Sequence, residues 1–253
     1  MPDISVVVIT FNEEENIERC LHSVEGIADD IVVVDSFSDD KTVELCERIG
    51  VRVVRHAFEG YTKQKNWAIA QARFPHILSL DADEAVSPEL KQSICSVKGL
   101  WACDGYEFNR LTNYCGTWIK HTDWYPDRRL RLWDSSKGLW QGETIHESVH
   151  LNKGCSKGFL KGDLHHYSYY SIRQHIEQLN RFTDMMALEA RKKGRTARYP
   201  DLVIRPAWKF VKSYFLRLGF LDGYHGFVVC LISAFATFVK YAKVRQLVHE
   251  RKA

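Results

Sequence analysis

The segment ISVVVITFNEE (residues 4–14) is the strongest indication of the fold class, because an almost unbroken apolar run ends here in polar side chains. Near-continuous runs of β-branched residues are typical of parallel strands that are buried on both faces. Similar runs recur at residues 31–35 (IVVVD), 51–55 and 77–80, with helical patterns between them. This alternation predicts an α/β fold with an open, mostly parallel sheet, flanking helices and right-handed crossovers.

Helices are expected in each connection of this sheet. The apolar face of the first runs from Ile17 to Val24, and Asn12 is placed to cap it. Others are expected after Asp39, over residues 63–73, and from Ser87, which precedes a proline.

The second half of the chain follows a different pattern. Residues 106–110 and 129–132 alternate in polarity, which predicts strands added to the far edge of the sheet. Residues 172–193 and 206–247 are predicted to be helical, so we expect a catalytic domain over 1–170 and a helical C-terminal region over 171–253. The apolar run 227–239 is shorter than the ~20 residues of a membrane span, which favours a buried or membrane-interface helix.

Composition is that of a globular protein, with 45% hydrophobic and 26% charged residues. The seven cysteines are odd in number and form no C-x-x-C pair, which favours a reducing compartment. The N-terminal residues lack the basic region and cleavage site of a signal peptide. A cytoplasmic location is therefore expected.

Charge is distributed unevenly along the chain. Residues 191–253 carry 14 Lys and Arg against 3 Asp and Glu, whereas the preceding 190 residues are net acidic. A basic region rich in aromatic residues predicts contact with an anionic membrane surface; a solvated basic face is the alternative. We expect no nucleic-acid partner.

The predicted strands end in acidic segments, at residues 10–13 (TFNE), 35–40 (DSFSDD) and 81–84 (DADE). Because ligands of parallel sheets bind at the carboxyl ends of the strands, these segments mark the expected site. Asp81 and Asp83 lie two residues apart and suit Mg²⁺ or Mn²⁺ bound to phosphate oxygens, although a pair of turn aspartates would give the same pattern. Neither a G-x-G-x-x-G motif nor a P-loop is present.

Three ordered motifs resemble those of the family-2 glycosyltransferases of the GT-A fold: SVVVITFNEE (5–14), VDSFSD (34–39) and Asp81-Ala82-Asp83. The resemblance implies a nucleotide-sugar donor, with Asp35 accepting a hydrogen bond from uracil and Lys65 and Asn66 beside the diphosphate and ribose. Independently, Arg128 and Arg131 could hold a phosphate or an anionic sugar, or could face solvent. The expected donor-binding residues are Thr10, Phe11, Glu13, Asp35, Lys65, Asn66, Asp81, Ala82, Asp83, Arg128 and Arg131.

Later segments narrow the resemblance. Residues 124–132 (WYPDRRLRL), 145–149 (IHESV) and 162–167 (GDLHHY) resemble bacterial lipopolysaccharide-core glucosyltransferases. This implies an inverting enzyme that transfers a sugar, expected to be glucose from a UDP-sugar, to a hydroxyl of a glycolipid or saccharide acceptor. A polyprenyl-phosphate sugar transferase and a non-catalytic, membrane-associated nucleotide-sugar-binding protein are the alternatives.

A general base must take the proton of the acceptor hydroxyl, and a carboxylate suits this role. Glu147 is the first candidate, with Asp127 and Glu143 as the others; a structural pairing of Glu147 with Arg128 or Arg131 is the competing interpretation. His146, His165 and His166 are possible additional metal ligands, and His165 is preferred.

Overall fold

The computed structural model describes residues 2–142 and 147–249. The chain divides into two compact units, which we call the sheet unit (Met1–Arg110 and Asp127–Tyr167) and the helical unit (Leu111–Pro126 and Ser168–Ala253). The division falls close to residue 170, but residues 111–126 belong to the helical unit. They do so because Tyr114 and Ile119 pack against Val229 of the C-terminal helix, a long-range contact that no local pattern reveals.

Strand β1 (Ile4–Thr10) is the centre of the parallel half of the sheet. It pairs in parallel with β2 (Asp30–Asp35) on one side and β4 (His76–Asp81) on the other, and β3 (Arg52–Arg55) forms the edge beyond β2. Every β1 residue is buried, as expected for a strand that is covered on both faces.

Alternate side chains of the strands pack into two separate cores. Val6 and Val8 pack in the core formed with helices α1 (Ile17–Ser23), α2 (Thr42–Ile49) and α4 (Pro88–Gly99). Val7 and Ile9 pack on the opposite face, against α3 (Tyr61–Ile69) and the two-stranded sheet of β9 (Gly138–Gln141) and β10 (Ser148–Leu151). The period of two along β1 therefore produces both cores.

The sheet continues beyond β4 with antiparallel strands. Strand β8 (Asp127–Asp134) pairs with β4 and with β6 (Gly105–Tyr114), followed by β11 (Lys157–Tyr169) and β5 (Glu84–Val86). Strand β7 (Thr117–Ile119) pairs with β6, and a 3₁₀ turn, η1 (Ser135–Lys137), follows β8. Among the described residues, nine strands form this sheet. The predicted α/β class with its added edge strands is confirmed.

The start of α4 is confirmed, because the Ser87 hydroxyl accepts the backbone N–H of Leu90. The predicted cap of α1 is wrong: this helix begins at Ile17, and Asn12 lies upstream of it in the left-handed region with φ +53°. The Asn12 side-chain oxygen instead accepts the backbone N–H of Asp39 at 3.0 Å. Asn12 therefore ties the segment after β1 to the segment after β2.

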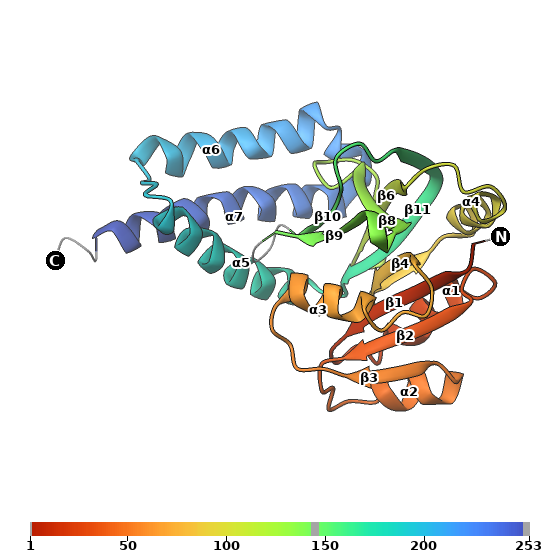
Figure 1. Cartoon of the computed structure of the whole chain (residues 1–253). Helices are drawn as coiled ribbons and strands as arrows, with labels where there is room; N and C mark the ends of the chain where they lie inside the picture. Colours follow the sequence, from red (N-terminus) through yellow and green to blue (C-terminus); the bar gives the residue numbers. More distant parts are fainter. Residues whose placement is uncertain (1, 143–146, 250–253) are drawn as a thin grey trace. The chain divides into compact units, whose positions relative to one another are not determined.

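The helical unit contains α5 (Ile172–Lys192), α6 (Tyr199–Val211), the π-helical turn η2 (Lys212–Leu216), the 3₁₀ turn η3 (Gly219–Asp222) and α7 (Gly223–His249). Figure 1 shows α6 and α7 side by side. The helix expected over 172–193 is confirmed. The region expected over 206–247 consists of two helices, of which the first begins earlier, at Tyr199.

The last helix is longer than the 13-residue apolar run from which it was predicted. Residues Gly219–Leu247 are long and apolar enough to cross a membrane by length and composition, and 28% of the apolar window is buried. The 13-residue run understated the length because the helix continues past the run at both ends. Length and composition alone do not distinguish a spanning helix from one that packs on a folded domain.

Candidate active site

Three polar strand ends lie side by side at the carboxyl edge of the parallel strands. In the register of the sheet, Thr10 of β1 is opposite Asp35 of β2, and Ile9 is opposite Asp81 of β4. The structure thus brings together residues from three predicted strand ends. This is the edge at which open parallel sheets bind ligands.

Asp35 is fully buried, and both its oxygens accept the backbone N–H of Ser38, at 3.1 and 3.2 Å. Thr10 is also buried, and its hydroxyl has no hydrogen-bond partner among the described residues. An unpaired buried hydroxyl is costly, so a bound ligand that pairs with it would gain affinity. Phe11 follows with 57% of its surface exposed, which leaves its ring free to contact a ligand.

Glu13 adds a further carboxyl group to this edge. Burial and the nearby charge of Asp83 raise the pKa of Glu13 to about 7, and Asp81 contributes in the same direction. The Asn16 amide donates to Glu13 at 2.7 Å and opposes the shift. The raised pKa of Glu13 therefore reflects burial first and the nearby carboxylates second, and a bound cation would relieve the second effect.

Asp81 is held between two buried cations. The Lys65 ammonium lies 2.9 Å from its Oδ1, and the Arg131 guanidinium lies 3.1 Å from its Oδ2. Burial opposes ionisation, but these two cations hold the pKa of Asp81 well below its usual range. Asp81 is therefore a fixed anion of an internal charge network rather than a free ligand.

The network extends away from the edge through Glu84, whose side chain is fully buried. Arg131 contacts Glu84 at 3.0 Å, and Arg110 reaches Glu84 at 3.5 Å and Asp127 at 2.9 Å. The Glu84 carboxylate also accepts the backbone N–H of Asp81 at 3.0 Å. These contacts hold the backbone of the D-x-D segment in place through Glu84.

The indole of Trp140 covers the two cations. Its ring centre lies 4.3 Å from the Lys65 ammonium and 4.9 Å from the Arg131 guanidinium. Asn66 holds this tryptophan in place. The Asn66 side chain donates to the backbone carbonyl of Trp140 at 2.9 Å and accepts the backbone N–H of Trp140 at 3.0 Å. The expected contact of Asn66 with diphosphate or ribose stays a prediction, and it would use the second N–H or the second lone pair of an amide that already holds Trp140.

Asp83 faces a histidine, but not the expected one. His166 Nε2 lies 3.2 Å from Asp83 Oδ2, and its other ring nitrogen is buried without a hydrogen-bond partner among the described residues. His165 directly precedes His166 in β11, so its side chain points to the opposite face of the sheet. Across residues 2–142 and 147–249, no three His, Cys, Asp or Glu side chains are grouped so that they could hold a metal ion.

The sequence model of glycosyl transferase family 2 matches residues 5–161. The chain belongs to this family. It is 32% identical to an uncharacterized glycosyltransferase of Rickettsia typhi, over 98% of this chain and 88% of that protein. It is 27% identical to the lipopolysaccharide core biosynthesis glycosyltransferase LpsC of Rhizobium meliloti, over 96% of this chain and 92% of that protein. The crystal structure of S. aureus TarS in complex with UDP-GlcNAc aligns with a TM-score of 0.48 at 15% identity, covering 98% of this chain and 92% of that chain.

In this family-2 glycosyltransferase, Glu147 lies beside the buried network. Its carboxylate is 3.4 Å from the Lys65 ammonium, so its ion-pair partner is neither Arg128 nor Arg131. About a fifth of the Glu147 side chain remains exposed. Asp127 is instead engaged by Arg110 and by Arg129, each at 2.9 Å. Glu143 and His146 lie outside the described residues.

The two arginines that were expected to act together are separated. Arg131 is 3% exposed, and its guanidinium contacts the carboxylates of Asp81 and Glu84. Arg128 is exposed, and its guanidinium lies 4.8 Å from the ring centre of Phe159. Only Arg128 keeps a guanidinium that could meet an anion from solvent.

Sequence reasoning missed Glu84, Arg110 and Trp140. Glu84 stands next to the D-x-D motif, so its acidity was visible, but its pairing with strands β6 and β8 was not. The burial of Arg110 could not be predicted either, because an alternating strand shows which residues share a face but not which face is buried.

Proposed function

We propose that this family-2 glycosyltransferase is an inverting enzyme that transfers glucose from a UDP-sugar. The acceptor is a hydroxyl group of a glycolipid of the lipopolysaccharide-core type. The observation that carries the proposal is the gathering of Asp35, Asp81 and Asp83 at the carboxyl edge of the sheet, with buried cations behind Asp81.

The donor's base and ribose are assigned to the ends of β1 and β2. Asp35 is oriented by Ser38 and retains acceptor capacity toward an N–H group of uracil. The unpaired Thr10 hydroxyl and the exposed Phe11 ring supply a polar and an apolar contact beside it. A flat base with N–H donors suits this combination.

A divalent cation, Mg²⁺ or Mn²⁺, is assigned to Asp83 together with His166 in place of His165. Asp83 supplies the carboxylate that Mg²⁺ or Mn²⁺ usually takes from a protein, His166 would add one nitrogen ligand, and phosphate oxygens and water would complete the coordination. When bound, the cation would neutralise charge on the departing nucleoside diphosphate. Asp81 supports this site indirectly, because its carboxylate is already paired with Lys65 and Arg131.

We assign the role of general base to Glu147, which would accept the proton of the acceptor hydroxyl. The acceptor oxygen forms a bond to the anomeric carbon as the bond from that carbon to the diphosphate oxygen breaks, and Glu147 takes the hydroxyl proton. Lys65 holds the Glu147 carboxylate at 3.4 Å and links it to Asp81, which positions the base relative to the donor edge. A single displacement of this kind inverts the anomeric configuration.

The acceptor class is inferred from the relative of Rhizobium meliloti, whose name places it in lipopolysaccharide core biosynthesis. A glycolipid acceptor would be met at the inner face of the cytoplasmic membrane. We therefore propose a cytoplasmic enzyme that is peripheral to that membrane.

A donor screen tests the proposal. Purified protein is given UDP-glucose, UDP-GlcNAc or GDP-mannose with a deacylated core oligosaccharide, and nucleotide release is measured with Mn²⁺, with Mg²⁺ and with EDTA. We expect release from UDP-glucose that requires both metal and acceptor. Release with GDP-mannose alone, or equal rates in EDTA, would contradict the donor or the metal assignment respectively.

A further inference from the structure

Helix α6 exposes an apolar face that its own unit does not cover. Val203 is 69% exposed, Ile204 is 64% exposed and Trp208 is 57% exposed. At about 100° per residue, Ile204 and Trp208 lie one turn apart on the same side, with Val203 beside them. Soluble monomers rarely leave large apolar side chains gathered in this way.

Helix α7 also has an exposed apolar face. Leu231, Phe235 and Phe238 are spaced by four and three residues, so they share one face of the helix, and each is at least 40% exposed. The opposite side of α7 packs inward through Val229 and Val244. Helix α7 is therefore well packed on one side and apolar and exposed on the other.

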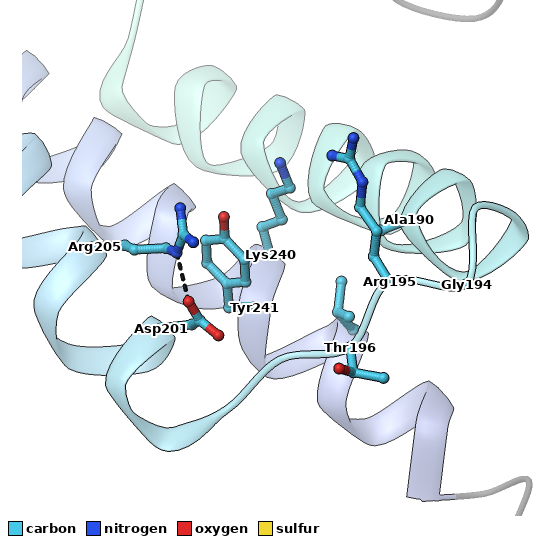
Figure 2. A pocket seen from close by; sticks show the side chains of 9 residues that line it. Ala190, Gly194, Arg195, Thr196, Asp201, Arg205, Lys240 and Tyr241 are labelled. Atoms are coloured by element: carbon cyan, nitrogen blue, oxygen red, sulfur yellow. Dashed lines mark hydrogen bonds and ion pairs between the residues drawn. The ribbon is translucent and has the colours of Figure 1, made fainter.

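A cationic pocket of about 490 Å³ lies within the helical unit, lined by residues of α5, α6, α7 and the connection from α5 to α6 (Figure 2). Figure 2 shows the charged ends of Arg195 and Lys240 projecting to the same side, and Arg205 paired with Asp201. The Tyr241 ring lies against two of these cations, 5.2 Å from Arg205 and 5.6 Å from Lys240.

The pocket carries more positive than negative charge. Asp201 offsets one of its three cations, and within the described part of the chain neither Arg195 nor Lys240 has an acidic partner within ion-pair distance. Arg205 follows Ile204 directly in α6, so the pocket borders the apolar face. Guanidinium and ammonium groups beside apolar side chains match a phosphate that is attached to an acyl chain.

We propose that the helical unit binds the surface of an anionic phospholipid bilayer, with the lipid phosphate in the cationic pocket and the exposed faces of α6 and α7 in the acyl region of one leaflet. This deepens the proposed function, because a glycolipid acceptor lies in such a surface. A second copy of the chain fits the surface less well, since the unpaired cations of two copies would repel each other.

The packing of α7 favours an in-plane helix over a spanning one. Lys243 pairs with Asp184 of α5 at 2.7 Å and also donates to Asn180, while Val244 packs against Ala187 and Ala190. Moving α7 across a bilayer would remove these contacts or draw the charged helix α5 into the hydrocarbon, which is costly.

Flotation of the full-length chain with vesicles tests the proposal. Vesicles of phosphatidylcholine with about one quarter phosphatidylglycerol supply the anionic lipid, pure phosphatidylcholine supplies the neutral surface, and soluble glycerol phosphate tests a free phosphate as competitor. We expect binding to anionic vesicles at low salt, weak binding to neutral ones, and competition only at high glycerol phosphate concentration.

Two variants separate the pocket from the apolar face. Arg195→Gln combined with Lys240→Gln should lower partitioning to anionic vesicles roughly thirtyfold, and Val203→Ser combined with Trp208→Ser should lower it to anionic and neutral vesicles alike. Leu100→Ser and Lys161→Gln are matched controls, because both side chains are exposed on the sheet unit.

The readout is lipid binding and not transfer, so this proposal and the proposed function can fail separately. Equal effects of the control and test variants, binding indifferent to lipid charge, or dimerisation without vesicle binding would overturn it. Protein that resists alkaline carbonate extraction from the vesicles would show that α7 spans the bilayer and would overturn the in-plane arrangement.

Discussion

Replacing Arg131 with methionine should destabilise the sheet unit strongly while keeping most of the side-chain volume. Arg131 is 3% exposed and contacts two carboxylates, Glu84 at 3.0 Å and Asp81 at 3.1 Å. Within the described residues, its loss leaves the buried Glu84 with Arg110, at 3.5 Å, as its remaining ion-pair partner. Removing one partner of a buried ion pair costs about 3 to 5 kcal/mol, because the remaining charge is uncompensated.

Hydrogen exchange of peptides from β1 and β2, measured with increasing urea, reads the opening free energy of the sheet unit without interference from the helical unit. Arg128→Met is the matched control: it is the same change on the same strand, but Arg128 is exposed and its guanidinium lies over the Phe159 ring, so it should cost about 1 kcal/mol or less. The double variant Glu84→Gln with Arg131→Met should be more stable than the sum of the single effects by about 2 kcal/mol. A cost below about 1 kcal/mol for Arg131→Met would refute the buried network as a source of stability.

Three further predictions concern the site and the helical unit. Asp83→Ala should abolish transfer and the metal-dependent part of donor binding, measured by calorimetry with and without Mn²⁺, whereas Glu89→Gln on the exposed start of α4 should leave both intact; unchanged transfer in Asp83→Ala would remove the metal assignment. Glu147→Gln should keep donor affinity but lower kcat by about 10²-fold or more, and a turnover close to wild type would turn attention to Asp127 or Glu143. Burial lowers the pKa of His175 from 6.5 to about 4; the unfolded chain therefore binds a proton that the folded chain does not, and stability should fall by about 2 kcal/mol as the pH drops from 7 to 5. Urea unfolding of the helical unit at both pH values checks this, and an equal drop in His175→Gln would show that another group is responsible.

Much of the sheet unit follows from local sequence. An apolar strand buried on both faces must be β-branched and continuous, so residues 4–10 and 31–35 could be recognised without any knowledge of their neighbours. Because parallel strands share one carboxyl edge, the acidic ends of these strands could be assigned to one site before their distances were known. The fold class was predictable for this reason, whereas the family was predicted from the resemblance of three sequence motifs.

The roles within the site depended on tertiary contacts. Asn66 and Arg131 carry the same functional groups whether they face a ligand or the interior, and only the structure shows Asn66 paired with Trp140 and Arg131 paired with Glu84. His165 and His166 are adjacent in sequence, and the register of β11 against β5 decides which of them reaches Asp83.

Local periodicity and composition were sufficient to predict the parallel sheet, its acidic edge and the basic, aromatic character of the C-terminal helices. The binding of Asp81 by Lys65 and Arg131, and the uncovered apolar faces of α6 and α7, could be seen only in the folded chain. The physical reason is that ion pairing and burial depend on residues far apart in the chain, whose approach is fixed by strand pairing and helix packing rather than by local pattern.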